Sequence, residues 1–358
     1  MSLSDLPVEL LDQIFEPLSP NALAALAITT SFFNSSATRH LYRDISLSAY
    51  THNLNAVNTL ATQPRLASLV RNFSLNVDDS DGVLREYYVL LSNALQNMPN
   101  LHSLDLHVDS HASWILFPSS SGGSPLTYSG LQHFATSFSL DKNLMQFLTR
   151  TPSLISLQLP PSFIESDCAE LPLLAIPNLA SYTGPSSFLR QIAPGRPLVT
   201  LHLSGDLSLH DIEHISHSVL PVTSNTDAES GVDSENGVEV LSAITSTPPT
   251  VFLETLAKAC PRLACLRVMT TCAFWEAPDL TFYSSIANTL STLRSLNAFE
   301  LSGMHWESRP KSTAVSDDGA PSEKEWVSPP VTPRVLDVDE VNEENSHDFE
   351  EAFLEWAY

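Results

Sequence analysis

Residues 94–106 read ALQNMPNLHSLDL, and this stretch contains both elements of one structural unit. An amphipathic helix is expected to end near Pro99, because the residue before a proline is pushed out of the α region of backbone angles. The leucines at 101, 104 and 106 follow the pattern L-x-x-L-x-L, which predicts a short strand with alternate side chains turned inward. A single unit leaves its apolar face uncovered, so several copies are expected to stack into one continuous core.

The same pattern recurs along the chain at residues 154–159, 198–203, 263–268 and 296–301, with a valine or a phenylalanine replacing one leucine in the last two. Residues 147–154 and 256–263 repeat the preceding apolar helical stretch and its proline. The first leucines are 53, 44, 65 and 33 residues apart, more than the period of about 20–29 that is typical of such repeats. A worn copy around residues 177–182 is expected in one gap, and insertions in others.

These motifs resemble the leucine-rich repeat. The resemblance implies an α/β fold, an irregular leucine-rich-repeat solenoid over residues 49–306. The Asn or Cys expected after the last leucine of each repeat is absent, and Asp109, Ser162, Asp206, Thr271 and Met304 stand at those positions instead. A generic α/β domain with parallel strands is therefore the alternative.

The N-terminal region has a different pattern. Residues 6–18 read LPVELLDQIFEPL, with Leu10, Ile14 and Leu18 at i, i+4 and i+8, which predicts an amphipathic helix that begins at Pro7. Ser19 and Pro20 have the form of an N-cap and first position of a second helix. Helices this short are marginally stable alone, so they are expected to pack on one another or on a partner.

This region resembles an F-box, on the opening Leu-Pro-x-Glu-Leu-Leu, the leucine-rich second helix and the closing segment 41–47, LYRDISL. The predicted F-box covers residues 1–48. The resemblance implies binding of the Skp adaptor of an SCF (Skp–cullin–F-box) ubiquitin ligase, and through it of cullin and RING subunits. Many F-boxes have a tryptophan in the third helix, where this chain has Phe32 or Phe33. The matching adaptor-binding positions are Leu6, Pro7, Leu10, Leu11, Ile14, Leu18, Leu23, Leu26 and Ile28.

Three segments have the composition of flexible chain. Residues 117–130 are rich in Ser, Gly and Pro, and residues 221–249 are acidic and poor in aromatics. Residues 307–358 form an acidic tail with fourteen acidic and four basic side chains, and it is predicted to be mostly disordered. Phe349, Phe353 and Trp356 near its end share one helical face, so a short capping or partner-binding helix is the alternative to a frayed end there.

The net charge of −24 excludes most nucleic-acid-binding classes, because phosphates require Lys and Arg. No N-terminal apolar run resembles a signal peptide, and no run approaches the roughly 20 apolar residues that a membrane span needs. We expect a soluble protein of the cytoplasm and/or the nucleus with no membrane partner. The cysteines 168, 260, 265 and 272 are then expected to be reduced and mostly buried.

No catalytic, cofactor-binding or metal-binding motif is present, so we expect no enzyme and no cofactor. His210, His214 and His217 approach helical spacing beside Asp211, but a solvated helix face is the preferred interpretation. The predicted function is that of a substrate-recognition adaptor, in which the F-box holds the Skp adaptor and the repeats recruit an unknown target protein. The alternative is a repeat-based interaction scaffold with no link to ubiquitin transfer.

Overall fold

The computed structural model describes residues 6–48, 53–77, 85–117, 127–161, 170–216, 237–272, 280–310 and 324–327. The chain begins with three helices, α1 (Val8–Phe15), α2 (Pro20–Thr29) and α3 (Ser31–Arg43). Ser19 Oγ accepts a hydrogen bond from the Ala22 amide, which confirms the predicted N-cap, and Thr30 Oγ1 accepts from the Phe33 amide. The three helices enclose a small apolar core that contains Leu11, Phe15, Leu23 and Ala37.

A twelve-stranded sheet follows, and its strands stand side by side in chain order. The first ten strands are parallel to their neighbours, and the last two pairings are antiparallel. The strands are β1 (Asp44–Ser48), β2 (Asn72–Asn76), β3 (Ser103–His107), β4 (His133–Thr136), β5 (Ser156–Gln158), β6 (Ser181–Pro185), β7 (Thr200–Asp206), β8 (Val240–Thr245), β9 (Cys265–Thr270), β10 (Ala298–Leu301), β11 (Met304–Pro310) and β12 (Lys324–Val327).

One row of paired residues runs through all ten parallel strands and explains the uneven leucine spacing. The row consists of Ile45, Phe73, Leu104, Phe134, Leu157, Tyr182, Leu201, Leu241, Leu266 and Phe299. The predicted strands correspond to β3, β5, β7, β9 and β10, and the worn copy near Tyr182 is β6. Each of the three longest gaps thus contains one further strand, namely β4, β6 or β8.

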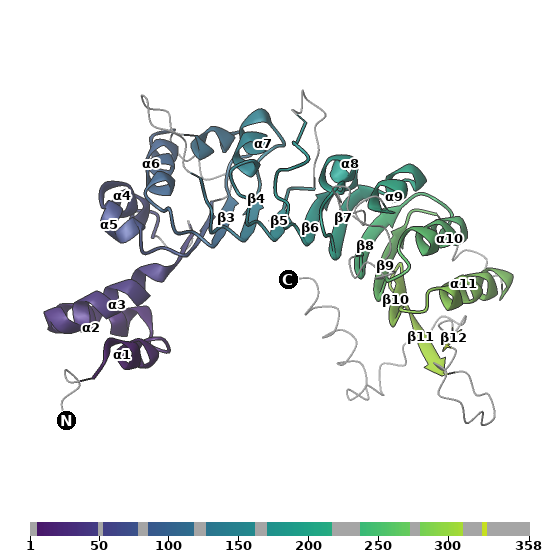
Figure 1. Cartoon of the computed structure of the whole chain (residues 1–358), viewed down its shortest axis with the longest axis horizontal. Coiled ribbons are helices and arrows are strands. Elements are labelled where there is room, and N and C mark those ends of the chain that lie inside the picture. The colour runs from purple at the N-terminus through teal and green to yellow at the C-terminus, as the bar shows by residue number, and fades with distance from the viewer. Residues whose placement is uncertain are drawn as a thin grey trace, which may run out of the picture.

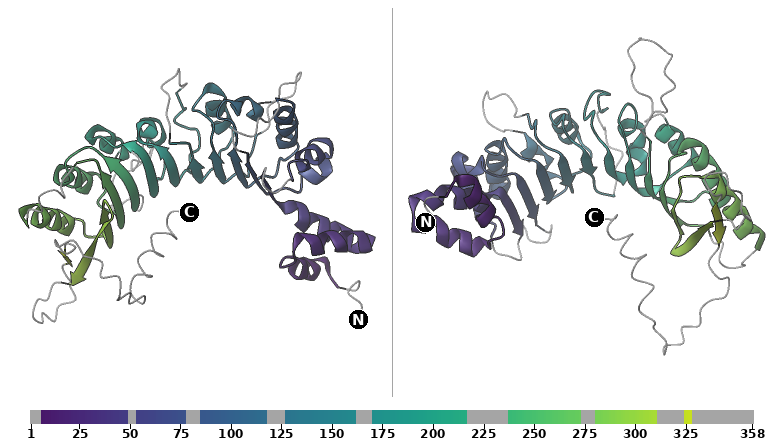
Figure 2. Two further views of the ribbon diagram at one scale, coloured as in Figure 1. Left: turned by 180° about the vertical axis from the view of Figure 1, so that it is seen from behind. Right: turned by 60° about the horizontal axis from the view of Figure 1, so that its bottom comes forward.

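Helices cover one face of this sheet, and the strands line the other, so that the whole array bends into an arc (Figure 1). A helix is about 10 Å wide whereas neighbouring strands lie about 4.8 Å apart, so a layer of helices on one side makes that side longer. The α-helices of this layer are α4 (Ala56–Thr62), α5 (Pro64–Ala67), α6 (Arg85–Gln96), α7 (Lys142–Leu148), α8 (Leu189–Ile192), α9 (Leu209–Ser216), α10 (Pro249–Ala259) and α11 (Leu280–Thr292). Within the described residues, 3-10 helices also lie at Ala112–Leu116 and Ser186–Phe188. The strands therefore form the concave face (Figure 2).

Two Pro-Asn-Leu sequences tie neighbouring units together. The side-chain amide of Asn100 donates to the carbonyl of Ser68 at 2.8 Å, and that of Asn178 donates to the carbonyl of Pro152 at 3.1 Å. Each asparagine side chain thus donates a hydrogen bond to a backbone carbonyl in a turn of the preceding unit. Because these bonds satisfy turn carbonyls that lie outside the strand ladder, they stabilise the stacking of one unit on the next.

Parts of two segments predicted to be flexible belong to the folded array. The prediction for residues 221–249 is wrong in its last part, because residues 240–245 form β8, whose alternate residues Leu241, Ala243 and Thr245 are buried. In the insertion at 117–130, Tyr128 is buried, and its hydroxyl donates to the Leu95 carbonyl. Residues 118–126 and 217–236 lie outside the described residues. Both segments were predicted to be flexible because their acidic or glycine-rich composition concealed the short apolar patterns within them.

The predicted boundary at residue 307 falls inside β11. Ser302 and Gly303 both have positive φ, which suits a tight hairpin between β10 and β11. Strand β11 then pairs with β12, and Trp306 and Trp326 are 3% and 4% exposed. Part of the predicted disordered tail therefore covers the end of the sheet core, while the aromatic residues at 349–356 lie outside the described residues.

Candidate protein-interaction surfaces

The three N-terminal helices present an unusual number of apolar side chains to solvent. We define the N-terminal apolar set as the residues Val8, Leu10, Ile14, Ile28 and Phe32, which are 43–87% exposed. The described residues contain twelve exposed large apolar side chains, and five of them belong to this 43-residue unit. Such a concentration on a small domain is typical of a protein-interaction site.

Helix α1 is apolar on two faces, and the fold uses only one of them. Leu11 and Phe15 are 1% and 4% exposed and lie in the core of the three-helix unit. Leu10 and Ile14, also spaced four residues apart, are 44% and 43% exposed. The second pair contributes little to this unit's own stability and is available to a partner.

The nine adaptor-binding residues predicted from the sequence fall into three groups. Leu10, Ile14, Ile28 and Pro7 are exposed. Leu6, Leu18 and Leu26 are partly buried against the small core, and Leu11 and Leu23 are buried within it. Leu11 and Leu23 therefore stabilise the three-helix unit from its core.

Two members of the N-terminal apolar set are absent from that prediction. Val8 was missed because the helical count started from Leu10, although an apolar residue in the first turn after Pro7 is a usable signal. Phe32 is one of two phenylalanines at the position where many F-boxes have a tryptophan. Its side chain is 43% exposed and contacts Phe33, with ring centroids 5.5 Å apart.

A polar cluster fixes α1 on α3. Asp12 forms a salt bridge with Arg39, and its second oxygen lies 3.3 Å from His40 Nε2. Partial burial acts to raise the pKa of Asp12, but the hydrogen bond and charge of Arg39, together with the hydrogen bond to His40, hold this pKa below its usual value. The ionised carboxylate therefore stabilises the orientation from which Leu10 and Ile14 are presented.

The second surface is a groove of about 990 Å³ on the concave face of the sheet, across β4 to β10. We call it the concave groove. Its floor carries hydroxyl, amide and imidazole groups together with a few aliphatic side chains. The lining residues are His133, Ile155, Ser156, Gln158, Ser181, Thr183, Thr200, His202, Val240, Leu241, Ser242, Ala264, Cys265, Leu266, Arg267, Asn297 and Ala298.

Comparison with known protein families identifies the N-terminal unit. Residues 3–48 match the F-box-like family. The matched segment includes α1 to α3 and the first strand of the sheet, β1. F-box domains generally bind the Skp adaptor and typically serve as adaptors. No curated protein matches the chain.

The F-box passes into the sheet directly. Arg43 is the last residue of α3, and Asp44 is the first residue of β1. A hollow of about 660 Å³ lies at this joint, and Asp12 and Arg39 of the F-box line it together with Arg71 and His102 of the array. Because the helix and the strand share a peptide bond, the F-box is held at one edge of the sheet.

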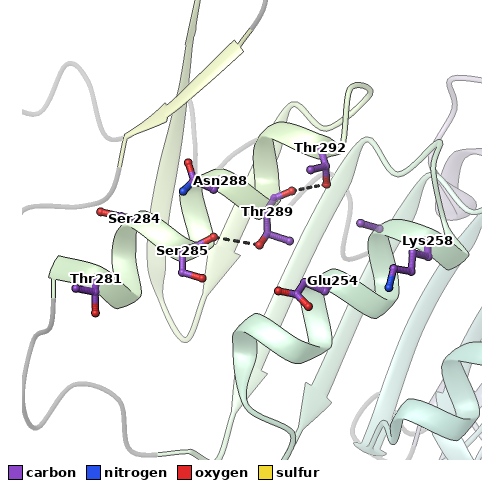
Figure 3. A pocket seen from close by; sticks show the side chains of 9 residues that line it. Glu254, Lys258, Thr281, Ser284, Ser285, Asn288, Thr289 and Thr292 are labelled. Carbon is purple, nitrogen blue, oxygen red and sulfur yellow. Dashed lines mark hydrogen bonds between the residues drawn. The ribbon is translucent and has the colours of Figure 1, made fainter.

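A third hollow, of about 890 Å³, lies on the helical face between α10 and α11 (Figure 3). Two of its hydroxyl groups are already used within α11, since Thr289 donates to the Ser285 carbonyl and Thr292 donates to the Thr289 carbonyl. The side chains of Glu254 and Lys258 in α10 add one charge of each sign.

The described residues contain no group of three or more His, Cys, Asp or Glu side chains that could hold a metal ion. The rings of His210 and His214 on α9 contact edge to face, with centroids 5.0 Å apart, while His217 lies outside the described part of the chain. Burial raises the pKa of the Cys260 thiol to about 12, so this thiol stays protonated and unreactive at neutral pH. In the same described ranges, no helix has the length and apolarity to cross a bilayer.

Proposed function

We propose that this protein is a substrate receptor of an SCF-type ubiquitin ligase, in which the F-box holds the Skp adaptor and the sheet recruits a target protein. The observation that carries the proposal is the match of residues 3–48 to the F-box-like family, combined with the exposed N-terminal apolar set in the same segment. Cullin and RING subunits would join through the adaptor. Such a receptor would act in the cytoplasm and/or the nucleus.

The energetics of adaptor binding follow from the exposed residues of α1. Leu10 and Ile14 would each contribute about 1.5–3 kcal/mol when a partner buries them fully. Several such side chains on one small unit are sufficient for a specific interface, because a few buried anchors dominate the binding free energy. The ion pair between Asp12 and Arg39 would keep these anchors oriented before binding.

The substrate-binding half of the proposal is that residues 49–306 form an irregular leucine-rich-repeat solenoid. Parallel strands in chain order, helices on the opposite face and one continuous row of apolar residues support it. The row has steps of between 19 residues (Tyr182 to Leu201) and 40 residues (Leu201 to Leu241), which is wider than a regular repeat allows. The concave groove would hold the target.

The proposed mechanism is one of proximity. A target held in the concave groove would share one assembly with the ubiquitin-conjugating enzyme, so the effective concentration of its lysines near the charged ubiquitin would rise strongly. The direct passage from α3 to β1 supports this role, since a fixed geometry between the two binding surfaces limits the positions that the target can take.

The proposal is tested by capture of the full chain on purified Skp adaptor. We expect the parent chain to bind and the variants Leu10→Asp and Ile14→Asp to lose at least tenfold in affinity, because each places a charge at the apolar contact. Both side chains are more than 40% exposed, so the fold should survive, and circular dichroism checks this. Val89→Asp is the matched control, because Val89 is 41% exposed on α6, outside the F-box.

Full-strength binding by Leu10→Asp and Ile14→Asp would contradict the proposal. Failure of the parent chain to bind the adaptor would leave the repeat-based scaffold as the remaining interpretation. Adding purified cullin to the captured complex separates the two interpretations further, since only a ligase receptor is expected to retain it.

A further inference from the structure

The concave groove contains almost no net charge, although the chain as a whole has a net charge of −24. Among the groove's described lining residues, Arg267 is the one Lys or Arg, and no Asp or Glu is present. Arg267 Nε lies 3.2 Å from Glu300 Oε2 on the neighbouring strand β10. The groove's single cation is therefore already paired.

The pairing of Arg267 opposes binding of phosphate or acidic groups. The side chain of Glu300 is 5% exposed, so it depends on Arg267 for charge compensation. A phosphate that took over the guanidinium would leave this buried carboxylate uncompensated and close to a second negative charge. Phosphopeptide sites instead contain clusters of unengaged arginines, and the groove has none among its described residues.

Strongly basic targets are disfavoured for the complementary reason. A lysine or arginine of the target would need a carboxylate, and the described lining of the groove contains none. The nearby Glu300 is buried and paired with Arg267. The charge distribution thus disfavours target segments of either charge and favours an uncharged segment.

The remaining groups of the groove suit uncharged polypeptide. Thr183 and Ser242 can donate and accept hydrogen bonds, while Ile155 is 38% exposed and supplies apolar contact. Seven strands at a spacing of about 4.8 Å span about 29 Å, which corresponds to an extended segment of about nine residues at roughly 3.3 Å per residue.

We propose that the concave groove binds an uncharged, unphosphorylated segment of about nine residues in an extended conformation. This inference rests on the proposed function of the sheet as the substrate-binding half, but not on the F-box contact with the adaptor. The recognised segment combines small polar side chains with aliphatic ones, and phosphorylation within it weakens binding.

The test uses the full-length chain and a random dodecapeptide display library as the probe. We expect the selected peptides to be depleted of Asp, Glu, Lys and Arg. Synthetic copies of the best binders, each made with and without one phosphoserine, are then measured by fluorescence polarisation. The phosphorylated copies should bind at least tenfold more weakly.

Two groove variants locate the site. Thr183→Glu and Ser242→Glu place a carboxylate on the groove floor and should weaken binding of the unphosphorylated peptides at least tenfold. Ser291→Glu is the matched control, because Ser291 is exposed on α11 on the helical face. Circular dichroism verifies that all three variants are folded.

Selection of acidic or phosphate-dependent peptides would overturn the inference, and so would unchanged binding by Thr183→Glu and Ser242→Glu or the absence of any selected peptide. Adaptor capture is measured separately on the same preparation. Loss of adaptor binding with intact peptide selection contradicts the ligase proposal alone, whereas the reverse result contradicts only the assignment of the groove.

Discussion

Leu41 and Tyr42 are neighbours in the chain, but their side chains pack into different hydrophobic cores. Leu41 contacts the small core of the F-box, whereas Tyr42 contacts the long core beneath the sheet. The last turn of α3 is therefore the place where one core ends and the other begins. The two parts are covalently continuous, yet each has its own apolar interior.

Separate cores predict separate effects of core substitutions. Phe15→Ala removes a ring that is 4% exposed in the F-box core and should cost about 3–5 kcal/mol of F-box stability. Hydrogen exchange should then rise in peptides from α1 to α3 and stay unchanged in β5 to β9. Phe252→Ala, at a fully buried ring of α10, is the reciprocal control. A uniform rise in exchange across both parts would show that they unfold as one unit.

The two exposed apolar residues missed in the sequence should contribute to adaptor binding. Phe32→Ala and Val8→Ala each remove a side chain that is more than 40% exposed, so folding stability should change by less than about 1 kcal/mol. Affinity for the Skp adaptor should fall by about 1–3 kcal/mol for Phe32→Ala and less for Val8→Ala. Isothermal titration calorimetry measures both. Affinities equal to that of the parent chain would remove these residues from the interface.

Arg196 should be among the most sensitive positions of the array. It is 1% exposed, and its guanidinium donates to the carbonyls of Ala175, Gln191, Ile192, Pro194 and Pro172. Burial lowers the pKa of this guanidinium to about 10, so it remains charged at neutral pH. Arg196→Met keeps the apolar stem but leaves these carbonyls without their donor, and should lower the free energy of unfolding by about 3 kcal/mol or more.

Urea unfolding at pH 7 measures this loss. Arg190→Met is the matched control, since Arg190 is exposed on α8 nearby, and it should change stability by less than about 0.5 kcal/mol. Equal stability of the two variants would show that the five hydrogen bonds contribute nothing.

The buried thiol of Cys260 predicts a loss of stability at alkaline pH. Burial raises its pKa from 9.0 to about 12, so above pH 9 the unfolded chain releases this proton while the folded chain keeps it. The folded state then binds more protons, and stability falls as pH rises from about 9 to 12. Between pH 9 and pH 10.5 the loss from this group should be about 2 kcal/mol.

Urea unfolding at pH 8 and pH 10.5 measures that slope. The variant Cys260→Ala retains the buried tyrosines, among them Tyr128 and Tyr182, and lacks only the thiol. Its alkaline loss should therefore be smaller than that of the parent chain by the contribution of Cys260. Identical slopes for the two proteins would contradict the prediction.

The sequence predicted the units of the array where their apolar pattern was intact. Leu104 and Leu106 lie in β3, Leu101 precedes it, and all three are buried, as the L-x-x-L-x-L pattern predicted. Strand β4 escaped notice because Phe134 and the buried Thr136 replace leucines there. Strand β8 lies directly after an acidic segment, whose composition hid its alternation.

The F-box was recognisable from local sequence alone because its motifs are contiguous. The sequence could not decide which apolar face of α1 is free, since Leu10 and Ile14 have the same spacing and chemistry as Leu11 and Phe15. That choice depends on where α2 and α3 pack. The match to residues 3–48 concerns the F-box, so the Skp adaptor remains a proposal for this chain, as do its cullin, RING and substrate partners.

Local periodicity thus indicated many of the segments that become helices and strands, because that choice depends largely on neighbours two to four residues apart. Only the tertiary structure decided the composition of the concave groove. Parallel pairing aligns Thr183 with His202, then Ser242, Arg267 and finally Glu300 in one row, from segments up to 117 residues apart. The neutrality of that row is a property of strand register, and register across loops of unequal length cannot be derived from any one segment.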